Sequence, residues 1–359
     1  MKIKKRYLKL FVFLGVVFAV AILICCILFN LTYNVYVSSY GMSSISEGCL
    51  SDVAVVDGKI YYSYYGNVFN SGVYEISDNN TKRILPAEVD FFPNVIVTVP
   101  PLMTYHNKLI IDIPGNEHLL TYTENGTLKT FSDFNMELDT YSETMDGTGH
   151  FNSEINLFDE KLYLLSLEFD NTQSDDINRL YAYDDHSNQF NLLHDFKSEI
   201  VTYCIEKNDI YYVTKNDNEY HLYRVNKNNE PVFIKTLYYK NINSIYVFDK
   251  YVYVLSDKTN DVNSRNNFYI ESINSDYRKL IFSGYQLYVQ YDDGIFAFTD
   301  ASEKSNGIYL YSLKTAVTEK ISDYQASQVS ICDNIIYFVS DHALYCYNCE
   351  SKNTNMIFN

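Results

Sequence analysis

The fold is decided by a stretch that begins Asn208-Asp209-Ile210-Tyr211-Tyr212-Val213 and continues, after a polar loop, with Leu222-Tyr223-Arg224-Val225. Tyr and β-branched residues favour strands, whereas Asn and Asp favour turns. The order is a polar turn, an apolar and aromatic run, a polar loop and a run with Tyr in second place. It predicts two short strands that follow one another.

The same pattern recurs along the chain at intervals of 41 to 53 residues. The apolar residue after each turn is Ile60, Leu109, Leu162, Ile210, Val252, Ile295 or Ile336. The second run is centred on Val73-Tyr74, Leu119-Leu120, Leu180-Tyr181, Leu222-Tyr223, Phe268-Tyr269, Ile308-Tyr309 and Leu344-Tyr345. Copies with four short strands each match the blades of a β-propeller, which repeat about every 40 to 50 residues. We therefore expect an all-β propeller of seven four-stranded blades, with six or eight blades as alternatives because the early copies are irregular.

Equal spacing distinguishes a propeller from other all-β folds. A β-sandwich or a pair of stacked barrels does not require equal repeats. No convincing amphipathic helix follows Phe29, which excludes helical solenoids. The 36 Tyr and 22 Phe agree with a strand-rich chain, although an AT-rich genome would also enrich Tyr, Asn, Ile and Lys.

The repeat resembles that of bacterial β-propeller domains of unknown function, which are related to the YWTD repeats of LDL-receptor-related proteins. Residues 57–76 and 208–225 carry the resemblance best, because each has a turn, an Ile-Tyr-Tyr strand and an apolar-Tyr strand. The resemblance covers most of residues 50–358, but no copy reads Tyr-Trp-Thr-Asp. It implies the propeller fold and a binding role, and it supplies no catalytic residues.

The N-terminal region predicts a membrane anchor. Residues 10–29 carry no charge, and a helix of this length spans roughly 30 Å, the thickness of a bilayer core. The basic residues of segment 1–9 keep that end in the cytoplasm. We expect a cytoplasmic stub at 1–9, a transmembrane helix at 10–31, a linker at 32–49 and an extracellular propeller at 50–359. A cleaved signal peptide or a lipoprotein signal is the rival, but no small-x-small site follows the run and Ile24 precedes Cys25.

The net charge excludes some partners of the outer domain. Five of the 28 basic residues lie in the stub, which leaves 23 against 45 acidic residues, or about −22. Nucleic acid and anionic lipid surfaces need a positive footprint, so neither is expected to bind this domain. High net charge also serves solubility without any partner.

The cysteines outside the anchor do not predict a metal or redox site. These five are Cys49, Cys204, Cys332, Cys346 and Cys349, and an odd number cannot all pair within one chain. The pair at 346 and 349 has no second ligand pair, which a structural zinc ion needs. Unpaired or locally bridged thiols are the simplest interpretation, and a bridge from Cys49 to a C-terminal cysteine would tie the ring shut.

The longest irregular segments are predicted to open on one face of the propeller. They are residues 133–153, 168–178, 256–267 and 300–307, which join successive blades or second and third strands. Long loops on one rim of a rigid scaffold often bind ligands, although surface loops also tolerate insertions. The candidate ligand-face residues are Asp146, His150, Asp170, Asp175, Asp176, Asp261 and Arg265. No cofactor is expected; calcium is an alternative, but these loops lack the D-x-D-x-D-G spacing.

The motifs of known enzyme classes are absent from the sequence. It contains no nucleophile elbow, HExxH, phosphate loop or dinucleotide fingerprint, and its seven His are dispersed. We therefore expect a membrane-anchored binding or scaffolding module for an envelope protein, peptide or glycan. The alternatives are an extracellular glycan hydrolase or lyase, and a sensor, for which the stub leaves little room.

Overall fold

The structure is a computed structural model of the chain. It describes residues 15–22, 45–46, 48–49, 51–66, 69–77, 80–90, 96–112, 119–122, 127–132, 154–169, 176–196, 199–257, 265–285, 287–300, 306–326, 329–341 and 343–358.

Antiparallel sheets make up almost all of the described chain after residue 50. Six sheets have four strands each. The first two consist of β2 (Val53–Val56), β3 (Lys59–Tyr64), β4 (Gly72–Ser77) and β5 (Asn80–Pro86), and of β8 (Leu102–Tyr105), β9 (Lys108–Asp112), β10 (Leu119–Tyr122) and β11 (Leu128–Ser132). The next two consist of β16 (Ile200–Glu206), β17 (Asp209–Asn216), β18 (Glu219–Val225) and β19 (Pro231–Leu237), and of β20 (Ser244–Phe248), β21 (Tyr251–Asp257), β22 (Arg265–Ser272) and β23 (Arg278–Tyr285). The last two consist of β24 (Leu287–Asp292), β25 (Ile295–Asp300), β26 (Gly307–Ser312) and β27 (Val317–Ser322), and of β28 (Val329–Cys332), β29 (Ile335–Ser340), β30 (Ala343–Asn348) and β31 (Asn353–Phe358).

A further sheet has five strands. Its members are β12 (Glu154–Phe158), β13 (Lys161–Phe169), β14 (Asp176–Asp184), β15 (Gln189–Phe196) and β1 (Gly48–Cys49), which lies beside β12. A separate hairpin consists of β6 (Glu88–Asp90) and β7 (Ile96–Thr98).

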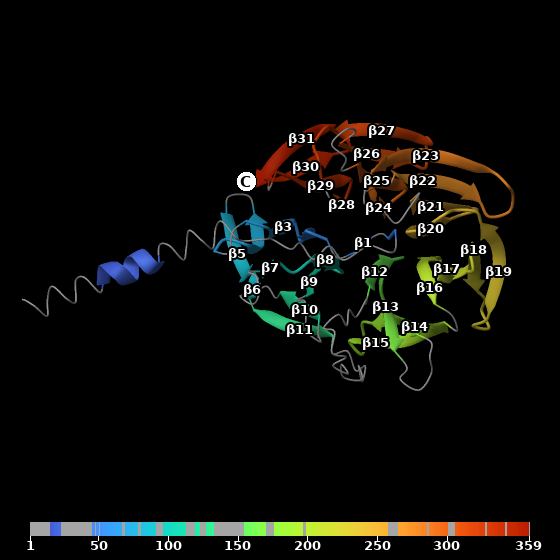
Figure 1. Ribbon diagram of the computed structural model, residues 1–359, viewed down its shortest axis with the longest axis horizontal. Helices are drawn as coiled ribbons and strands as arrows, with labels where there is room; N and C mark the ends of the chain where they lie inside the picture. Colours follow the sequence, from blue (N-terminus) through green and yellow to red (C-terminus); the bar gives the residue numbers. More distant parts are fainter. Residues whose placement is uncertain are drawn as a thin grey trace, which may run out of the picture.

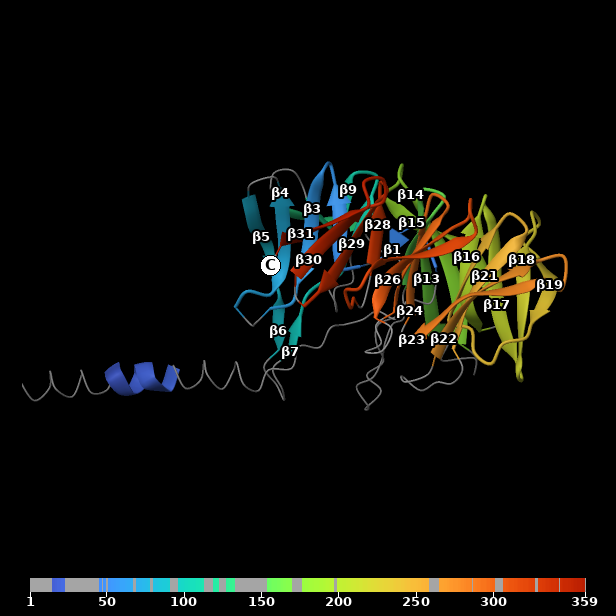
Figure 2. The same cartoon turned by 90° about the horizontal axis from the view of Figure 1, so that it is seen from above.

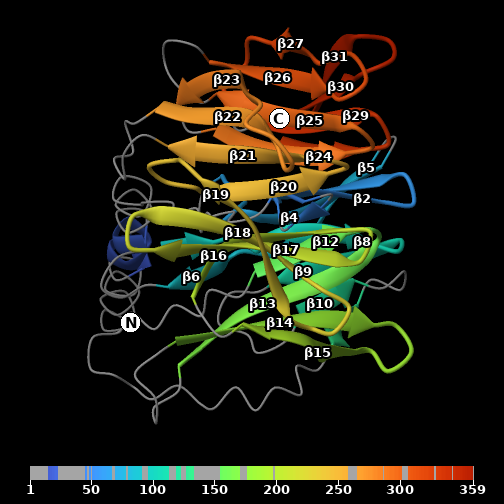
Figure 3. The same cartoon turned by 90° about the vertical axis from the view of Figure 1, so that its right-hand side faces the viewer.

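The sheets stand around a common axis, with the first strand of each nearest the centre and the last at the outside (Figure 1). Successive sheets pack face to face, as Figure 3 shows for β16–β19 and β20–β23. The predicted all-β propeller is confirmed. The prediction of seven four-stranded blades is corrected: six sheets have four strands, and β1 adds a fifth strand to the β12–β15 sheet. A two-residue strand upstream of the repeats carries no repeat signal, so its pairing was invisible in the sequence.

The residues aligned in the sequence occupy equivalent places in the sheets. Each apolar residue after a turn lies at the start of the second strand, and each apolar-Tyr pair lies in the third strand. Within every such pair the register with the fourth strand shifts by one residue. For example, Val73 pairs with Leu85 and Tyr74 with Arg83, so Ile84 is the extra residue of a β-bulge. The other shifts fall at the pairs beginning with Leu119, Leu180, Leu222, Phe268, Ile308 and Leu344.

These bulges give the apolar-Tyr pair a physical role. The first residue is fully buried in six copies: Val73, Leu180, Leu222, Phe268, Ile308 and Leu344. A bulge bends a strand and increases its twist, which discourages an outer edge from pairing with another molecule. Each repeat therefore encodes a buried side chain in its third strand and a bulged, twisted fourth strand at the outer edge.

The ring closes by side-chain packing between the last sheet and the β2–β5 sheet. The shared core contains Val53, Tyr62 and Leu344, and the rings of Tyr62 and Phe358 lie 5.8 Å apart. Near the axis, the Ser330 hydroxyl donates a 2.8 Å hydrogen bond to the Ser51 hydroxyl. In the residues that the structure describes, β28–β31 contains no strand from the N-terminal region.

Only part of the predicted N-terminal regions is described. Residues 15–22 form a helix within the predicted span of 10–31. Among the described residues, no helix is both long enough and apolar enough to cross a membrane. The stub and residues 32–44 and 47 of the predicted linker lie outside the described residues. Residues 48–49 form β1, and the buried Ile45 packs in the core of the ring.

Candidate functional site

The predicted ligand-face residues fall mostly outside the described chain. Asp146, His150, Asp170, Asp175 and Asp261 are not described. Asp176 begins β14, and its backbone pairs with Phe169. Arg265 begins β22 and is exposed, with its guanidinium 5.4 Å from the ring of Tyr285. The side chain of Asp176 is not described, so this face stays a prediction.

The largest hollow recorded in the described chain lies on the ring axis. It has a volume of about 890 Å³ and is lined by β2, β8, β12, β24 and β28 together with the turns that follow them. Val55, Met103, Leu157 and Ile331 form apolar parts of its wall. In antiparallel sheets the turns after the first strands and the loops after the second strands lie at opposite ends. This axial cavity therefore opens away from the face predicted from the long loops.

The rest of the axis is occupied by the segment before the first repeat. Gly48 pairs with Leu157 of β12, and the backbone N–H of Tyr291, in β24, donates a 3.2 Å hydrogen bond to the carbonyl of Ser46. Ile45 is only 1% exposed and belongs to the largest core cluster. Residues 45–46 and 48–49 therefore lie near the centre of the ring between β12 and β24, where Figure 1 and Figure 2 show β1.

The axial cavity is strongly acidic. Five carboxylates line it: Asp159, Glu160, Asp292, Asp293 and Asp333. No Lys or Arg is among its described lining residues, and none of the ion pairs recorded in the described chain involves these five. Negative charge is therefore concentrated in the described lining of the cavity, with no Lys or Arg in that lining.

The carboxyl of Asp292 is affected by burial and, to a lesser extent, by these neighbouring charges. Its pKa is raised from 3.8 to about 6, first by burial and then by repulsion from Asp293 and Asp333. The pKa of the neighbouring Cys332 thiol is raised to about 11 by burial and by Asp333 and Asp292. Cys332 is therefore a neutral thiol at physiological pH, which makes it a poor nucleophile.

Turn chemistry explains some of these acids but not all of them. Asp159, Asp293 and Asp333 are the first central residues of two-residue hairpin turns, with φ angles of 47°, 37° and 50°. Such turns need positive φ, which Asp tolerates well. Asp292 instead ends strand β24, where Asp is disfavoured, and Glu160 has a φ of 60°, which is unusual for Glu. The local backbone gives no reason for either residue.

A buried amide also faces this cavity. Gln290 is 4% exposed and lines the cavity, and its side-chain oxygen accepts a 3.1 Å hydrogen bond from the backbone N–H of Ile331. Among the described residues, no acceptor is recorded for the amide nitrogen of Gln290. The cavity wall therefore offers one hydrogen-bond donor, carried by a side chain that is otherwise held in place.

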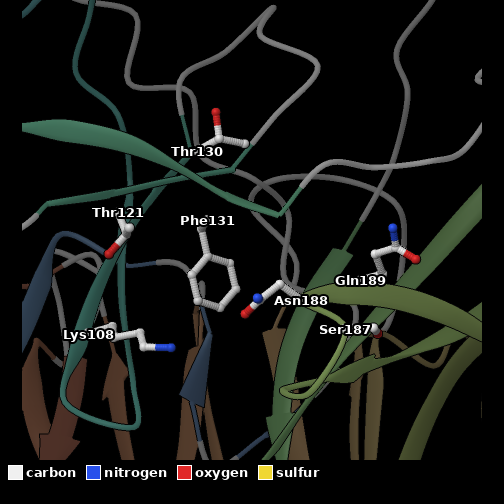
Figure 4. Close-up of a pocket in the computed structure, with 7 residues that line it drawn as sticks. All are labelled: Lys108, Thr121, Thr130, Phe131, Ser187, Asn188 and Gln189. Carbon is white, nitrogen blue, oxygen red and sulfur yellow. The ribbon is translucent and has the colours of Figure 1, made fainter.

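A second, smaller pocket of about 450 Å³ lies between the β8–β11 sheet and the turn that joins β14 to β15 (Figure 4). Lys108, Phe131 and Asn188 point into it, and Thr121, Thr130, Ser187 and Gln189 complete its lining. The ammonium of Lys108 lies 5.5 Å from the centre of the Phe131 ring. No carboxylate is among the described residues that line this pocket, and it opens between two sheets rather than on the axis.

The described residues do not form a recognisable catalytic or metal centre. No group of three or more His, Cys, Asp or Glu among them is arranged to hold a metal ion. The described cysteine side chains, those of Cys204, Cys332, Cys346 and Cys349, are free thiols, and the side chain of Cys49 is not described. His106 is the one histidine recorded in the axial lining, and its Nδ1 lies 3.7 Å from Asp185.

Sequence reasoning missed the axial cavity, although a signal was present. Acidic residues recur at the turns after the first strands, and this recurrence indicates that their carboxylates meet at one end of the ring. The most unusual of them is Asp292, which ends a strand and precedes a second acid, Asp293.

Comparisons with known proteins agree with the architecture. No protein-family model matches the sequence, and no curated protein matches it. Among solved structures, the acylaminoacyl peptidase of Pyrococcus horikoshii has a TM-score of 0.53 at 12% identity, covering 88% of this chain and 54% of that one. The puromycin-hydrolysing peptidase of Mycobacterium tuberculosis has a TM-score of 0.52 at 9% identity, covering 89% and 54%.

A nidogen–laminin complex also matches, with a TM-score of 0.37 at 10% identity over 55% of this chain and 75% of that one, which is too weak to carry an argument. This chain spans about half the length of the two peptidases. At such low identities the comparisons support the β-propeller fold and nothing finer, and membership of the bacterial propeller family stays a prediction.

Proposed function

We propose that this protein is a membrane-anchored, extracytoplasmic binding module that holds part of an envelope protein, peptide or glycan in its axial cavity. One observation carries the proposal: the cavity of about 890 Å³ is walled by the inner strands of five sheets. Ligand sites are typically concave, largely apolar hollows of about 300 to 1,000 Å³ with a few polar groups. The uncharged run at 10–29 and the basic stub supply the proposed anchor.

The rigidity of the wall favours binding. Side chains join the inner strands of neighbouring sheets: the N–H of Val55 donates to Thr104 Oγ1 at 3.0 Å, and the amide of Asn156 donates to the Tyr203 hydroxyl at 3.2 Å. A site held by such contacts is organised before a ligand arrives, which lowers the entropic cost of binding.

The proposal is tested by thermal unfolding of the full chain in detergent with panels of peptides and envelope glycans. A ligand that binds only the folded state stabilises it by about 2.7 kcal/mol at a hundredfold excess over Kd. Leu157→Trp, at a half-buried cavity position, should abolish the stabilisation, whereas Leu192→Trp, at a 54% exposed position on β15, should retain it. Stabilisation that survives Leu157→Trp, or none with any ligand class, would contradict the proposal.

The proposed location has its own test. Protease added to intact cells should digest the propeller, because residues 50–359 are proposed to lie outside the membrane. Full protection of a C-terminal tag would overturn this orientation.

A glycan hydrolase or lyase is the second candidate, and the raised pKa of Asp292 favours it. Glycosidases use one carboxyl kept protonated near neutral pH and a second that is ionised. Asp292, whose pKa is raised to about 6, has the character of the first of these carboxyls. Release of new sugar ends from envelope glycans, abolished by Asp292→Asn, would establish an enzyme, and the absence of turnover would reject it.

A further inference from the structure

We propose that the axial cavity binds a basic peptide segment, with Lys or Arg side chains on the acidic rim and a backbone carbonyl on the amide of Gln290. This inference rests on the proposed binding function and names the ligand class for the same site.

The five carboxylates that line the cavity, here called the acidic rim, are expected to attract a cationic ligand. They come from three separate turns: Asp159 and Glu160 after β12, Asp292 and Asp293 around the end of β24, and Asp333 after β28. A ligand with several positive charges along its length can reach more than one of these turns. Interactions between ionised donors and carboxylates are stronger than neutral hydrogen bonds, and more so in a partly enclosed site.

The protein's own lysines do not satisfy this rim. Lysines at or just after the turns between first and second strands are engaged elsewhere. Lys59 lies 3.4 Å from Glu75, and Lys161 donates to Asn208 at 3.3 Å. Lys207 lies 3.1 Å from Glu206, which is the main cause of its raised pKa; the charge of Asp159 makes a smaller contribution. None of them lines the cavity.

The amide of Gln290 is a second, independent pointer to a ligand. The residue is 4% exposed and lines the cavity, and no acceptor is recorded for its amide nitrogen among the described residues. A hydrogen bond from this amide to an acceptor on the ligand would contribute about 0.5 to 1.5 kcal/mol. An inorganic cation or a simple polyamine has no carbonyl, whereas every peptide unit has one.

The apolar wall favours a peptide over an amino sugar. Val55, Met103, Leu157 and Ile331 can pack against the methylene stems of Lys and Arg, which carry their charge at the far end. The hydroxyls of an amino sugar would lie against the same wall without partners, and burying a polar group without a hydrogen bond is costly.

The test uses the full chain in detergent at about 150 mM salt, where charges more than ~8 Å apart in solvent are screened. The probe is a fluorescent Gly-Lys-Gly-Lys-Gly peptide, compared with its doubly acetylated form and with spermidine as competitor. We expect the lysine peptide to bind, the acetylated peptide to bind at least about tenfold more weakly, and spermidine to compete poorly, since charge-assisted contacts are stronger than neutral ones.

A matched pair of variants locates the binding. Asp333→Asn and Asp249→Asn each remove one charge from the first position of an equivalent hairpin turn, with φ angles of 50° and 55°. Only Asp333 lines the cavity. The double variant Asp292→Asn/Asp333→Asn should weaken peptide binding at least about tenfold. Asp249→Asn should weaken it less than about twofold, as expected for an exposed charge. Equal losses in both would show diffuse attraction and overturn the proposal.

The failures of the two proposals are distinguishable. If the acetylated peptide or an amino sugar binds as well as the lysine peptide, and Leu157→Trp abolishes that binding, the cavity is a binding site and the basic-peptide inference is wrong. If no probe of any class binds and Leu157→Trp changes nothing, the binding function itself is wrong.

Discussion

The backbone N–H of Ile331 donates a 3.1 Å hydrogen bond to the side-chain oxygen of Gln290, and this bond joins β28 to β24 at the wall of the axial cavity. First strands of neighbouring sheets are not joined in a common backbone ladder, so such side-chain bonds fix their spacing. Val55 and Thr104 make the equivalent connection between β2 and β8. The geometry of the cavity therefore depends on a few polar side chains near the axis.

Gln290→Leu should destabilise the protein by about 1 to 3 kcal/mol, because the buried N–H of Ile331 loses its acceptor. The free energy of unfolding in urea, measured on the full chain, checks this. Thr354→Val, on an exposed stretch of β31, should change it by less than about 0.5 kcal/mol. If both substitutions cost the same, the bond between the sheets is not important for stability.

Asp292→Asn should stabilise the protein at pH 7 and lose this effect at low pH. The groups that face Asp292 are Asp293, Asp333, Cys332 and Cys349. A carboxyl whose pKa rises from 3.8 to about 6 on folding binds more protons in the folded than in the unfolded state between these values. Its contribution to stability therefore falls as pH rises through this window.

A shift of about two pKa units corresponds to roughly 3 kcal/mol for a fully buried group, and we expect about 1 to 2 kcal/mol because solvent screens this half-buried carboxyl. Thermal unfolding of the wild type and the variant from pH 4 to 8 measures the difference. A stabilisation by Asp292→Asn that is as large at pH 4 as at pH 7 would rule out titration as its cause.

Ile45→Ala should destabilise the propeller by about 2 to 5 kcal/mol, because truncating a buried Ile leaves a void in the core. The same measurement on Val317→Ala, at a 58% exposed position on β27, should show less than about 0.5 kcal/mol. A small effect of Ile45→Ala would mean that the segment before the first repeat does not contribute to the stability of the core.

Glu271→Gln should cost about 3 kcal/mol, because it leaves the partly buried ammonium of Lys235 without its counter-ion. The Nζ of Lys235 lies 2.6 Å from Glu271, and the Tyr239 hydroxyl donates to the same carboxylate at 2.9 Å. The control is Glu319→Gln, which breaks an exposed pair with Lys352 and should cost less than about 1 kcal/mol. The free energy of unfolding of both variants, measured in urea, tests this. Similar losses would show that the lower exposure of the Lys235–Glu271 pair does not make it more important for stability.

The sequence predicted the repeat well because repetition leaves many concordant signals. Every aligned apolar residue lies in a second strand and every apolar-Tyr pair in a third strand, as strand propensity and turn chemistry require. The bulge at each pair was not predicted, because it depends on the fourth strand having one extra residue, such as Ile84, and not on the pair itself.

The axial features were harder to predict because they depend on distant contacts. Gly48 and Cys49 form a strand only through pairing with β12, more than a hundred residues later. The carboxylates of the cavity meet because the ring brings separate turns together, and no spacing in the sequence records that meeting. The loop residues singled out instead, among them His150 and Asp261, lie outside the described chain.

The most direct measurement is a crystal structure of the chain with the Gly-Lys-Gly-Lys-Gly peptide bound. We predict peptide density in the axial cavity, with a lysine ammonium within about 4 Å of Asp292 or Asp333 and a backbone carbonyl at the amide of Gln290. Peptide density on another face, with the cavity occupied only by solvent, would contradict this.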